Sequence, residues 1–266
     1  EIRKPKTINL SVLFSDIKGF TSISETMKPD KLAEFINYYH ENMSKAILKK
    51  KGFIDKYIGD GTMAIFGAPV EYKDHAAYAC SAALECLREL AVLNAHYGAG
   101  GLPKLSIRIG LNTGPATAAY IGTSERSSYT VVGDAVNISS RLEGLNKHYR
   151  TSILAGPLTY EQAKNEFFFR PVDQVRVYGK QEPLKIYELV CAANEITDEL
   201  AKWGEIFCKA YEEFTAGHFR EALDLFREAR SYKPDDYLCY YYVERCEQLM
   251  RIRPEEWTAI TDFTTK

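Results

Sequence analysis

The stretch FSDIKGFTSISE, residues 14–25, contains the point at which an apolar strand gives way to a polar turn. Before that point Leu10, Val12 and Phe14 alternate with polar residues, the period-2 pattern of a strand with one buried face. Asp16 therefore lies where the strand leaves the sheet. An aspartate at such a place is also typical of a turn or a helix cap, so the rest of the chain has to decide its role.

Composition sets the broad class of the protein. The chain has 266 residues, 45% of them hydrophobic, enough for one large domain or a medium domain with a small appendage. Lys and Arg number 34 against 36 Asp and Glu, so no basic surface for nucleic acid is expected. Six cysteines without a CxxC pair favour free thiols, and no apolar stretch is long enough for a membrane span. We expect a cytoplasmic protein, or the cytosolic part of a larger membrane-anchored one, since the sequence does not begin with Met.

Hydrophobic periodicity predicts mixed helices and strands over the first part of the chain. A helix is expected from Pro29 to about Gly52, and then a hairpin of two short strands around Gly59-Asp60-Gly61. The further expected elements are a helix after Asp74, strands over 105–114, 118–122 and 127–133, a helix over 134–147, and strands over 172–177 and 184–190. This order predicts an α/β (α+β) fold of the ferredoxin-like βαββαβ type in a first domain, residues 1–192.

The remaining residues, 193–266, are expected to form a separate helical segment. GHFREALDLFREARSYKP, residues 217–234, follows the tetratricopeptide pattern. A single repeat cannot bury its own apolar face, so we expect it to dock on the main domain or on a second chain. It would brace a dimer or bind a protein partner, and a helical cap that merely ends the domain explains these residues equally well.

Two carboxylates are expected to meet at one end of the sheet. Asp16 ends the first strand, and Asp60 tops the hairpin that lies beside that strand in a ferredoxin-like sheet. Converging carboxylates repel unless a cation lies between them, and hard oxygen ligands suit Mg²⁺ or Mn²⁺. The turn Gly19-Phe20-Thr21 would expose backbone N–H groups to phosphate. A metal beside a phosphate cradle indicates phosphoryl transfer, whereas two unrelated acidic turns would explain each piece separately.

Four segments resemble the signature segments of the class III nucleotidyl cyclases, in order and at normal spacing, over about residues 7–190. They are FSDIKGFT, DKYIGDGTMAIFG, IGLNTGPA and YTVVGDAVNISSRLE. In that family two domains pair head to tail, and each site is built from both. The resemblance implies a homodimer that converts ATP to 3′,5′-cyclic AMP and pyrophosphate, through attack of the ribose 3′-hydroxyl on the α-phosphate.

The resemblance also implies roles for individual residues. Asp16, Asp60 and the backbone carbonyl of Ile17 would hold two Mg²⁺ or Mn²⁺ ions per site. Lys56 and Thr130 match the pair that selects the purine. A lysine can donate to adenine N1 and a threonine can accept from the exocyclic amine, so ATP is the expected substrate. Guanylyl cyclases carry an acidic residue and a cysteine at these two places.

Two observations qualify the purine pair. A threonine at position 130 resembles the subclass that includes the bicarbonate-responsive cyclases, whereas many adenylyl cyclases have aspartate there. Lys56 by itself could equally be a cross-strand lysine on the surface of the hairpin.

Asn137 and Arg141 are four residues apart and therefore share one face of the helix after Gly133. By resemblance, Asn137 orients the ribose and Arg141 stabilises the charge that develops at phosphorus. The alternative is that Arg141 forms a structural salt bridge with Glu143 or a neighbouring acid.

Lys180 and Arg126 are the remaining substrate contacts that the resemblance implies, both at the phosphates. The sequence departs from the family here, because Tyr178 replaces a second lysine and Pro115 replaces an arginine of some relatives. Two other functions stay open. One is a guanylyl cyclase, and the other is a non-catalytic module that senses ATP, whose expected mark is a missing metal aspartate or a missing Arg141.

Overall fold

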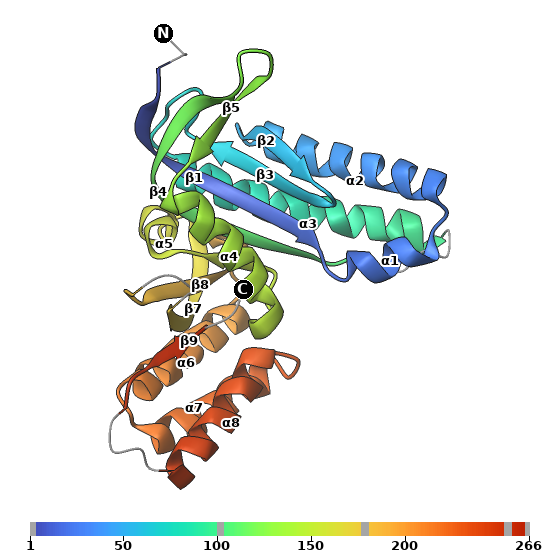
Figure 1. Cartoon of the computed structure of the whole chain (residues 1–266). Coiled ribbons are helices and arrows are strands. Elements are labelled where there is room, and N and C mark those ends of the chain that lie inside the picture. The colour runs from blue at the N-terminus through green and yellow to red at the C-terminus, as the bar shows by residue number, and fades with distance from the viewer. Residues whose placement is uncertain (1–3, 100–103, 177–180, 253–256, 264–266) are drawn as a thin grey trace. The chain divides into compact units, whose positions relative to one another are not determined.

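The computed structural model of the chain describes residues 4–99, 104–176, 181–252 and 257–263 (Figure 1). The chain divides into two compact units. The first unit comprises Glu1–Lys147 and Thr151–Ala163, and the second comprises His148–Arg150 and Lys164–Lys266. The sequence predicted a boundary between residues 192 and 193, where the pattern becomes wholly helical. That domain boundary stays a prediction.

The first unit contains a sheet with helices on it. Its elements are β1 (Lys6–Ile17), α1 (Phe20–Thr26), α2 (Pro29–Lys49), β2 (Phe53–Ile58), β3 (Gly61–Phe66), α3 (His75–Ala99), β4 (Ile107–Gly122), β5 (Ser127–Val132), most of α4 (Asp134–Tyr149), β6 (Ile153–Ala155) and α5 (Pro157–Ala163). The strand order is β2-β3-β1-β4-β6, and β5 pairs with the last part of β4. All pairs are antiparallel except β4 with β6. The arrangement β2-β3-β1-β4 confirms the predicted ferredoxin-like α/β fold class.

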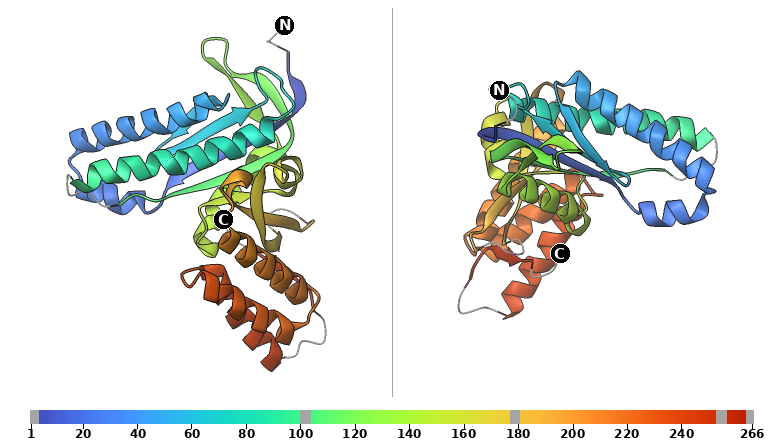
Figure 2. Two further views of the ribbon diagram at one scale, coloured as in Figure 1. Left: turned by 180° about the vertical axis from the view of Figure 1, so that it is seen from behind. Right: turned by 45° about the horizontal axis from the view of Figure 1, so that its top comes forward.

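Helices α2 and α3 lie side by side along one face of this sheet (Figures 1 and 2). The expectation that β1 has a single buried face is wrong, because Ser11, Leu13 and Ser15 are as buried as Leu10 and Val12. One face of the strand meets α3, where Ser11 Oγ lies 2.9 Å from His75 Nδ1. Polar residues are tolerated on that face because they bond to one another.

β4 is one continuous strand of 16 residues, although two strands, over 105–114 and 118–122, were expected. Pro115 pairs with Asn9 of β1 on one side. On its other side β4 pairs with β6 over Ile109–Leu111 and with β5 from Thr117 onward. Pro115 lies between these two ladders, and a strand tolerates proline where one side carries no ladder.

The second unit combines a small sheet with three helices. Its elements are β7 (Phe167–Arg176), β8 (Leu184–Ala192), a 3₁₀ turn η1 (Ala193–Glu195), α6 (Asp198–Thr215), α7 (Phe219–Tyr232), α8 (Tyr237–Ile252) and β9 (Ile260–Asp262). The predicted helices are present, and Gly217 (φ +85°) makes the turn between α6 and α7. Strand β9 was not expected from the sequence, because it gains its stability by pairing with β7. The relation of these helices to tetratricopeptide repeats stays a prediction.

A buried arginine ties α8 to the sheet of the second unit. The Arg170 guanidinium donates to both carboxylate oxygens of Asp236, at 2.6 and 2.7 Å, and to Glu188 at 2.6 Å. It also lies 4.6 and 4.5 Å from the ring centroids of Trp203 and Phe207 on α6. Such a buried charge is tolerated because every face of it has a partner.

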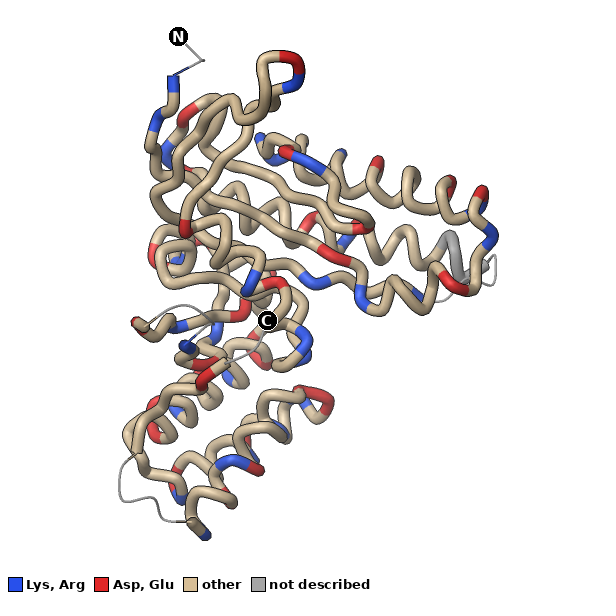
Figure 3. The backbone as a smooth tube through the Cα atoms, viewed as in Figure 1, with Lys and Arg blue, Asp and Glu red and all other residues tan. Residues whose placement is uncertain are grey.

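Charged residues of both signs are mixed along each unit and do not gather into one large patch (Figure 3). None of the helices in the described residues is long and apolar enough to cross a membrane. None of the six cysteines, all of which lie in the described residues, forms a disulfide.

Candidate active site

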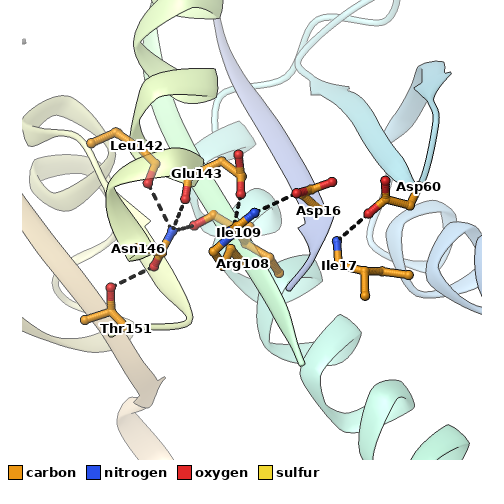
Figure 4. A network of polar contacts seen from close by, with 9 residues as sticks. All are labelled: Asp16, Ile17, Asp60, Arg108, Ile109, Leu142, Glu143, Asn146 and Thr151. Carbon is orange, nitrogen blue, oxygen red and sulfur yellow. Dashed lines mark hydrogen bonds and ion pairs between the residues drawn. The ribbon is translucent and has the colours of Figure 1, made fainter. Parts of the chain in front are cut away.

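Asp16 and Asp60 come together at one end of the sheet (Figure 4). Asp16 is the penultimate residue of β1, and Asp60 lies in the two-residue turn between β2 and β3. Gly59 makes this turn possible with φ at +63°, a value that glycine adopts without strain. The N–H of Ile17 donates to Asp60 Oδ2 at 3.0 Å. The structure therefore brings the two predicted carboxylates together.

The two carboxylates form an acidic pair that is only partly compensated. Burial, together with the hydrogen bond to Asp16 and its negative charge, raises the pKa of Asp60 to about 6. Burial and the charges of both aspartates also raise the pKa of nearby Glu143, against the opposing effect of Arg108. Closely spaced carboxylates that resist ionisation are stabilised when a cation binds between them.

This pair fits a divalent cation of the Mg²⁺ type. Mg²⁺ is usually held by one or two protein carboxylates, with water and substrate phosphates as its other ligands. The described residues contain no cluster of three or more His, Cys, Asp or Glu side chains suited to a metal. The other ligands would therefore be backbone, water or substrate oxygens. Ile17 contacts Asp60 through its N–H, and the metal-binding role of its carbonyl stays a prediction.

A basic residue that the sequence reasoning did not single out contacts Asp16. Arg108 of β4 donates from Nη2 to Asp16 Oδ2 and from Nε to Glu143 Oε1, each at 2.7 Å (Figure 4). The signal in the sequence was an arginine inside the otherwise apolar strand LSIRIG. A long charged side chain among strand residues is rarely buried unless it is paired.

A histidine on α2 supports the turn that carries Asp60. His40 Nε2 donates to the carbonyl of Gly59 at 3.0 Å, and Thr62 Oγ1 lies 3.4 Å from His40 Nδ1. The Tyr57 ring lies 4.3 Å from the imidazole, centroid to centroid. Burial lowers the pKa of His40, so the ring is neutral at pH 7. The sequence gives no signal for this role, because an isolated histidine has no ligand spacing.

Lys56 and Thr130, the predicted purine pair, are also in contact. Lys56 Nζ donates to Thr130 Oγ1 at 3.3 Å, which joins β2 to β5. The same ammonium group lies 3.1 Å from the buried carboxylate of Asp55. An edge-to-face contact between Phe53 and Tyr129, 5.9 Å between ring centroids, lies along the same two strands. The lysine is half-exposed, so it remains accessible to a ligand.

Asn137 and Arg141 lie on α4, which begins after Gly133. Asn137 is exposed and Arg141 is half-buried. Within the described residues the ion pair of Glu143 is with Arg108, not with Arg141. Because each helical residue turns the direction by about 100°, Glu143 points about 200° away from Arg141. Glu143 faces Asp16 through Arg108, so Arg141 projects from the other side of α4.

The residues predicted to contact the phosphates do not lie together within a single chain. Gly19, at φ +71°, directly precedes Phe20 and Thr21, which begin α1, so the proposed backbone cradle follows the end of β1. Arg126 lies in the turn between β4 and β5, beyond the start of β1 and therefore at the opposite end of that strand from Asp16. Lys180, like Tyr178, lies outside the described residues.

Comparisons with known proteins identify the family. A family model described as the adenylate and guanylate cyclase catalytic domain matches residues 2–190. The chain belongs to this family. Adenylate cyclase 1 of Rhizobium meliloti (strain 1021) is 38% identical over 181 residues, which cover 68% of this chain and 27% of that protein.

A second curated relative extends the similarity past the catalytic domain. The Dictyostelium discoideum protein named adenylate cyclase, terminal-differentiation specific, is 33% identical over 247 residues, 90% of this chain and 11% of that protein. Its similarity therefore reaches into the helices after residue 190. The chain spans only about a tenth to a quarter of the length of these two relatives.

Solved structures of both cyclase types resemble this one. The adenylyl cyclase CyaB from P. aeruginosa has a TM-score of 0.68 and 35% identity, covering 73% of this chain and all of that chain. The guanylyl cyclase Cya2 has a TM-score of 0.65 and 30% identity, covering 72% of this chain and 96% of that chain. The fold alone therefore does not distinguish the two substrates.

Proposed function

We propose that this chain is an adenylyl cyclase that converts ATP to 3′,5′-cyclic AMP and pyrophosphate. The observation that carries the choice of ATP is the contact between Lys56 and Thr130. A lysine ammonium can donate to adenine N1 but not to the N1–H of guanine, and the threonine oxygen can accept from the 6-amino group. Relatives named adenylate cyclase support the same assignment. Consumption of ATP and the free thiols favour a cytoplasmic location.

The catalytic roles follow the positions of the side chains. Asp16 and Asp60 would hold two Mg²⁺ or Mn²⁺ ions, with the carbonyl of Ile17 as a further ligand. Such ions, when bound, supply a lowered pKa for the ribose 3′-hydroxyl and neutralise negative charge on the phosphates. Asn137 would orient the ribose, and Arg141 would stabilise the charge that develops at phosphorus.

The substrate phosphates would be bound by groups outside the carboxylate pair. The backbone N–H groups of Gly19, Phe20 and Thr21 suit phosphate oxygens at the start of α1. Arg126 and Lys180 would contact the terminal phosphates through their charges.

The direction of Arg141 supports a site shared between two chains. Because Glu143 faces Asp16 through Arg108, Arg141 projects from the other side of α4, away from the metal site of its own chain. Arg126 is likewise at the other end of β1. A head-to-tail homodimer would bring the carboxylates of one chain to Lys56, Asn137 and Arg141 of the other.

Exposed apolar side chains in the first unit also support a dimer. They lie on β2, β4 and β5, and each is between 43 and 55% exposed: Tyr57, Ile58, Tyr120, Ile121 and Val132. Several large apolar residues exposed on the strands of one unit are typical of an interface. The helices of the second unit would act as a brace or bind a protein partner. The threonine-type subclass is proposed because Thr130 stands where many adenylyl cyclases have aspartate.

A product assay tests this function directly. The purified chain would be incubated with ATP or GTP and Mg²⁺ or Mn²⁺, and the nucleotides separated by chromatography. We expect cyclic AMP and pyrophosphate from ATP, and neither from the Asp60→Ala variant. Cyclic GMP as the main product would show a guanylyl cyclase. No cyclic product at protein concentrations that force dimers would favour the module that senses ATP without catalysis.

A further inference from the structure

The turn between β2 and β3 has little packing of its own. Gly59 and the preceding Ile58 are exposed, and a Cβ on Gly59 would meet no atom within 4 Å. The Asp60 side chain is tied to β1, because its Oδ2 accepts from the N–H of Ile17 (Figure 4). The backbone before Asp60 therefore depends on hydrogen bonds rather than on packing for its position.

His40 of α2 supplies such a bond. Its Nε2 donates to the carbonyl of Gly59 at 3.0 Å, and its Nδ1 lies 3.4 Å from Thr62 Oγ1. Gly59 precedes Asp60 by one residue and Thr62 follows it by two, so the ring spans the turn. Thr62 is itself fixed in the sheet, because it pairs with Ser15 of β1.

The two contacts decide which ring nitrogen of His40 carries the proton. A carbonyl oxygen can only accept, so the proton of the neutral ring lies on Nε2. Nδ1 is then an acceptor, and the Thr62 hydroxyl can donate to it. The other neutral tautomer would lose the bond to Gly59, so the polar contacts hold the ring in one state.

Packing also fixes the ring. His40 is only 8% exposed, and the ring of Tyr57 lies 4.3 Å from it, centroid to centroid. Its helix neighbours Tyr39 and Met43 are buried in the core. Because α2 cannot shift without disturbing that core, His40 presents the turn with a hydrogen-bond donor at a fixed place.

The ring acts on the turn without adding charge to it. Burial lowers the pKa of His40 from its usual value of 6.5, so the imidazole is neutral at pH 7. Removing a neutral ring changes no charge beside Asp16 and Asp60. A change in metal affinity on its removal would therefore report a change in the geometry of the turn.

We propose that His40 is a positioning residue that fixes the turn at Gly59 so that the Asp60 carboxylate faces Asp16, ready to bind a divalent cation. This inference rests on the proposed function, because it assumes that Asp60 binds metal. Groups that orient a metal ligand commonly change metal affinity about 10- to 100-fold when they are removed.

The test is Mn²⁺ binding to the whole chain at pH 7, followed by the electron paramagnetic resonance signal of free Mn²⁺, together with the melting temperature. His40→Phe keeps an aromatic ring and removes both polar contacts, so we expect it to weaken Mn²⁺ binding about tenfold. His40→Gln can place an amide N–H near the position of Nε2, and it should recover most of the affinity. The control is Ser44→Ala, which removes a 2.8 Å hydrogen bond from α2 to Tyr57 and should leave Mn²⁺ binding unchanged.

Two other roles for His40 give different results. If the ring only stabilised the fold, His40→Phe would lower the melting temperature and leave Mn²⁺ affinity unchanged. If the shape of the ring mattered and its hydrogen bond did not, His40→Gln would bind Mn²⁺ no better than His40→Phe. Either result would overturn the inference and leave the proposed function standing.

If His40→Phe does not fold, His40→Gln and His40→Asn decide, because the shorter asparagine does not reach as far toward Gly59. Tighter Mn²⁺ binding by the glutamine variant supports positioning, and equal or weaker binding overturns it. A wild-type chain that binds no Mn²⁺, or an Asp60→Asn variant that binds it normally, would overturn the proposed metal site itself.

Discussion

Lys56 Nζ and Thr130 Oγ1 lie 3.3 Å apart, although 74 positions separate the two residues in the sequence. β2 supplies the lysine and β5 supplies the threonine, so the pair exists only once the β4–β5 hairpin has folded back toward β2. A donor and an acceptor are thereby held side by side, which is the arrangement needed to recognise the edge of a purine.

The first prediction concerns this pair. Replacing Lys56→Glu and Thr130→Cys together should shift the preference from ATP toward GTP, because the acid accepts from guanine N1–H and no longer matches adenine N1. We expect the ratio of kcat/KM for ATP over GTP to fall about 100-fold or more, since a mismatched buried polar group is costly. Lys45→Glu, which changes an exposed lysine of α2, is the control. An unchanged ratio in the double variant would remove Lys56 and Thr130 from the purine site.

The second prediction concerns the shared site. Asp16→Ala and Arg141→Ala should each be inactive alone, because every site of either homodimer lacks one essential group. Mixing the two proteins should restore activity, since a heterodimer keeps one complete site out of two. The mixed sample should reach about a quarter of the wild-type rate if the chains exchange freely and equally. No recovery after verified exchange would contradict a site built from both chains.

The third prediction concerns the approach of α4 to β4. Gly110→Ala should displace the helix, because the new Cβ would meet backbone atoms of Ser139 and Glu143 at 2.1 and 2.3 Å. We expect a loss of about 3 kcal/mol in the free energy of unfolding, at the upper end for overpacking, and a large loss of cyclase activity. The measurement is denaturant unfolding together with turnover.

Gly144→Ala is a matched control on the same helix. A Cβ at Gly144 would meet nothing within 4 Å, and alanine is favoured over glycine in a helix by about 1 kcal/mol. This variant should be as stable as wild type or slightly more stable. Equal effects of the two substitutions would show that close packing at Gly110 does not matter.

Local patterns were sufficient to predict most elements of the fold. Alternation in β1 and the Gly59-Asp60-Gly61 turn predicted where Asp16 and Asp60 lie, because both depend on residues close in the sequence. The two-sided burial of β1 and the continuity of β4 through Pro115 were missed, since both depend on neighbouring elements. Strand β9 was missed for the same reason, because it forms by pairing with β7.

The sequence motifs predicted the candidate site residues that lie within them, but not the contacts that other residues make with those residues. The contact of Arg108 with Asp16 depends on the register between β1 and β4, and that of Arg108 with Glu143 depends on the seat of α4 on Gly110. Neither contact can be predicted from a local sequence pattern. His40 was missed for the same reason, since its role depends on the packing of α2 against the turn at Gly59.

The fourth prediction concerns the buried ion pair of the second unit. Burial would raise the pKa of Asp236, but hydrogen bonds and the charge of Arg170 outweigh it and hold the pKa below its usual value of 3.8. The unfolded carboxyl therefore binds a proton at a higher pH than the folded one. The stability from this pair is fully present above about pH 4 and is lost as the pH falls through the lower folded value.

Asp236→Asn should accordingly lower the free energy of unfolding by about 3 kcal/mol at pH 7, because the buried Arg170 charge loses one of its two carboxylate partners. The difference from wild type should stay constant down to about pH 4 and shrink below it, as the wild-type carboxyl becomes protonated. Tryptophan fluorescence reports the transition, since Trp203 packs against Arg170. Asp235→Asn, an exposed neighbour, should change little at any pH. A difference that persisted undiminished to pH 2.5 would mean that the ion pair is not the source of the stability.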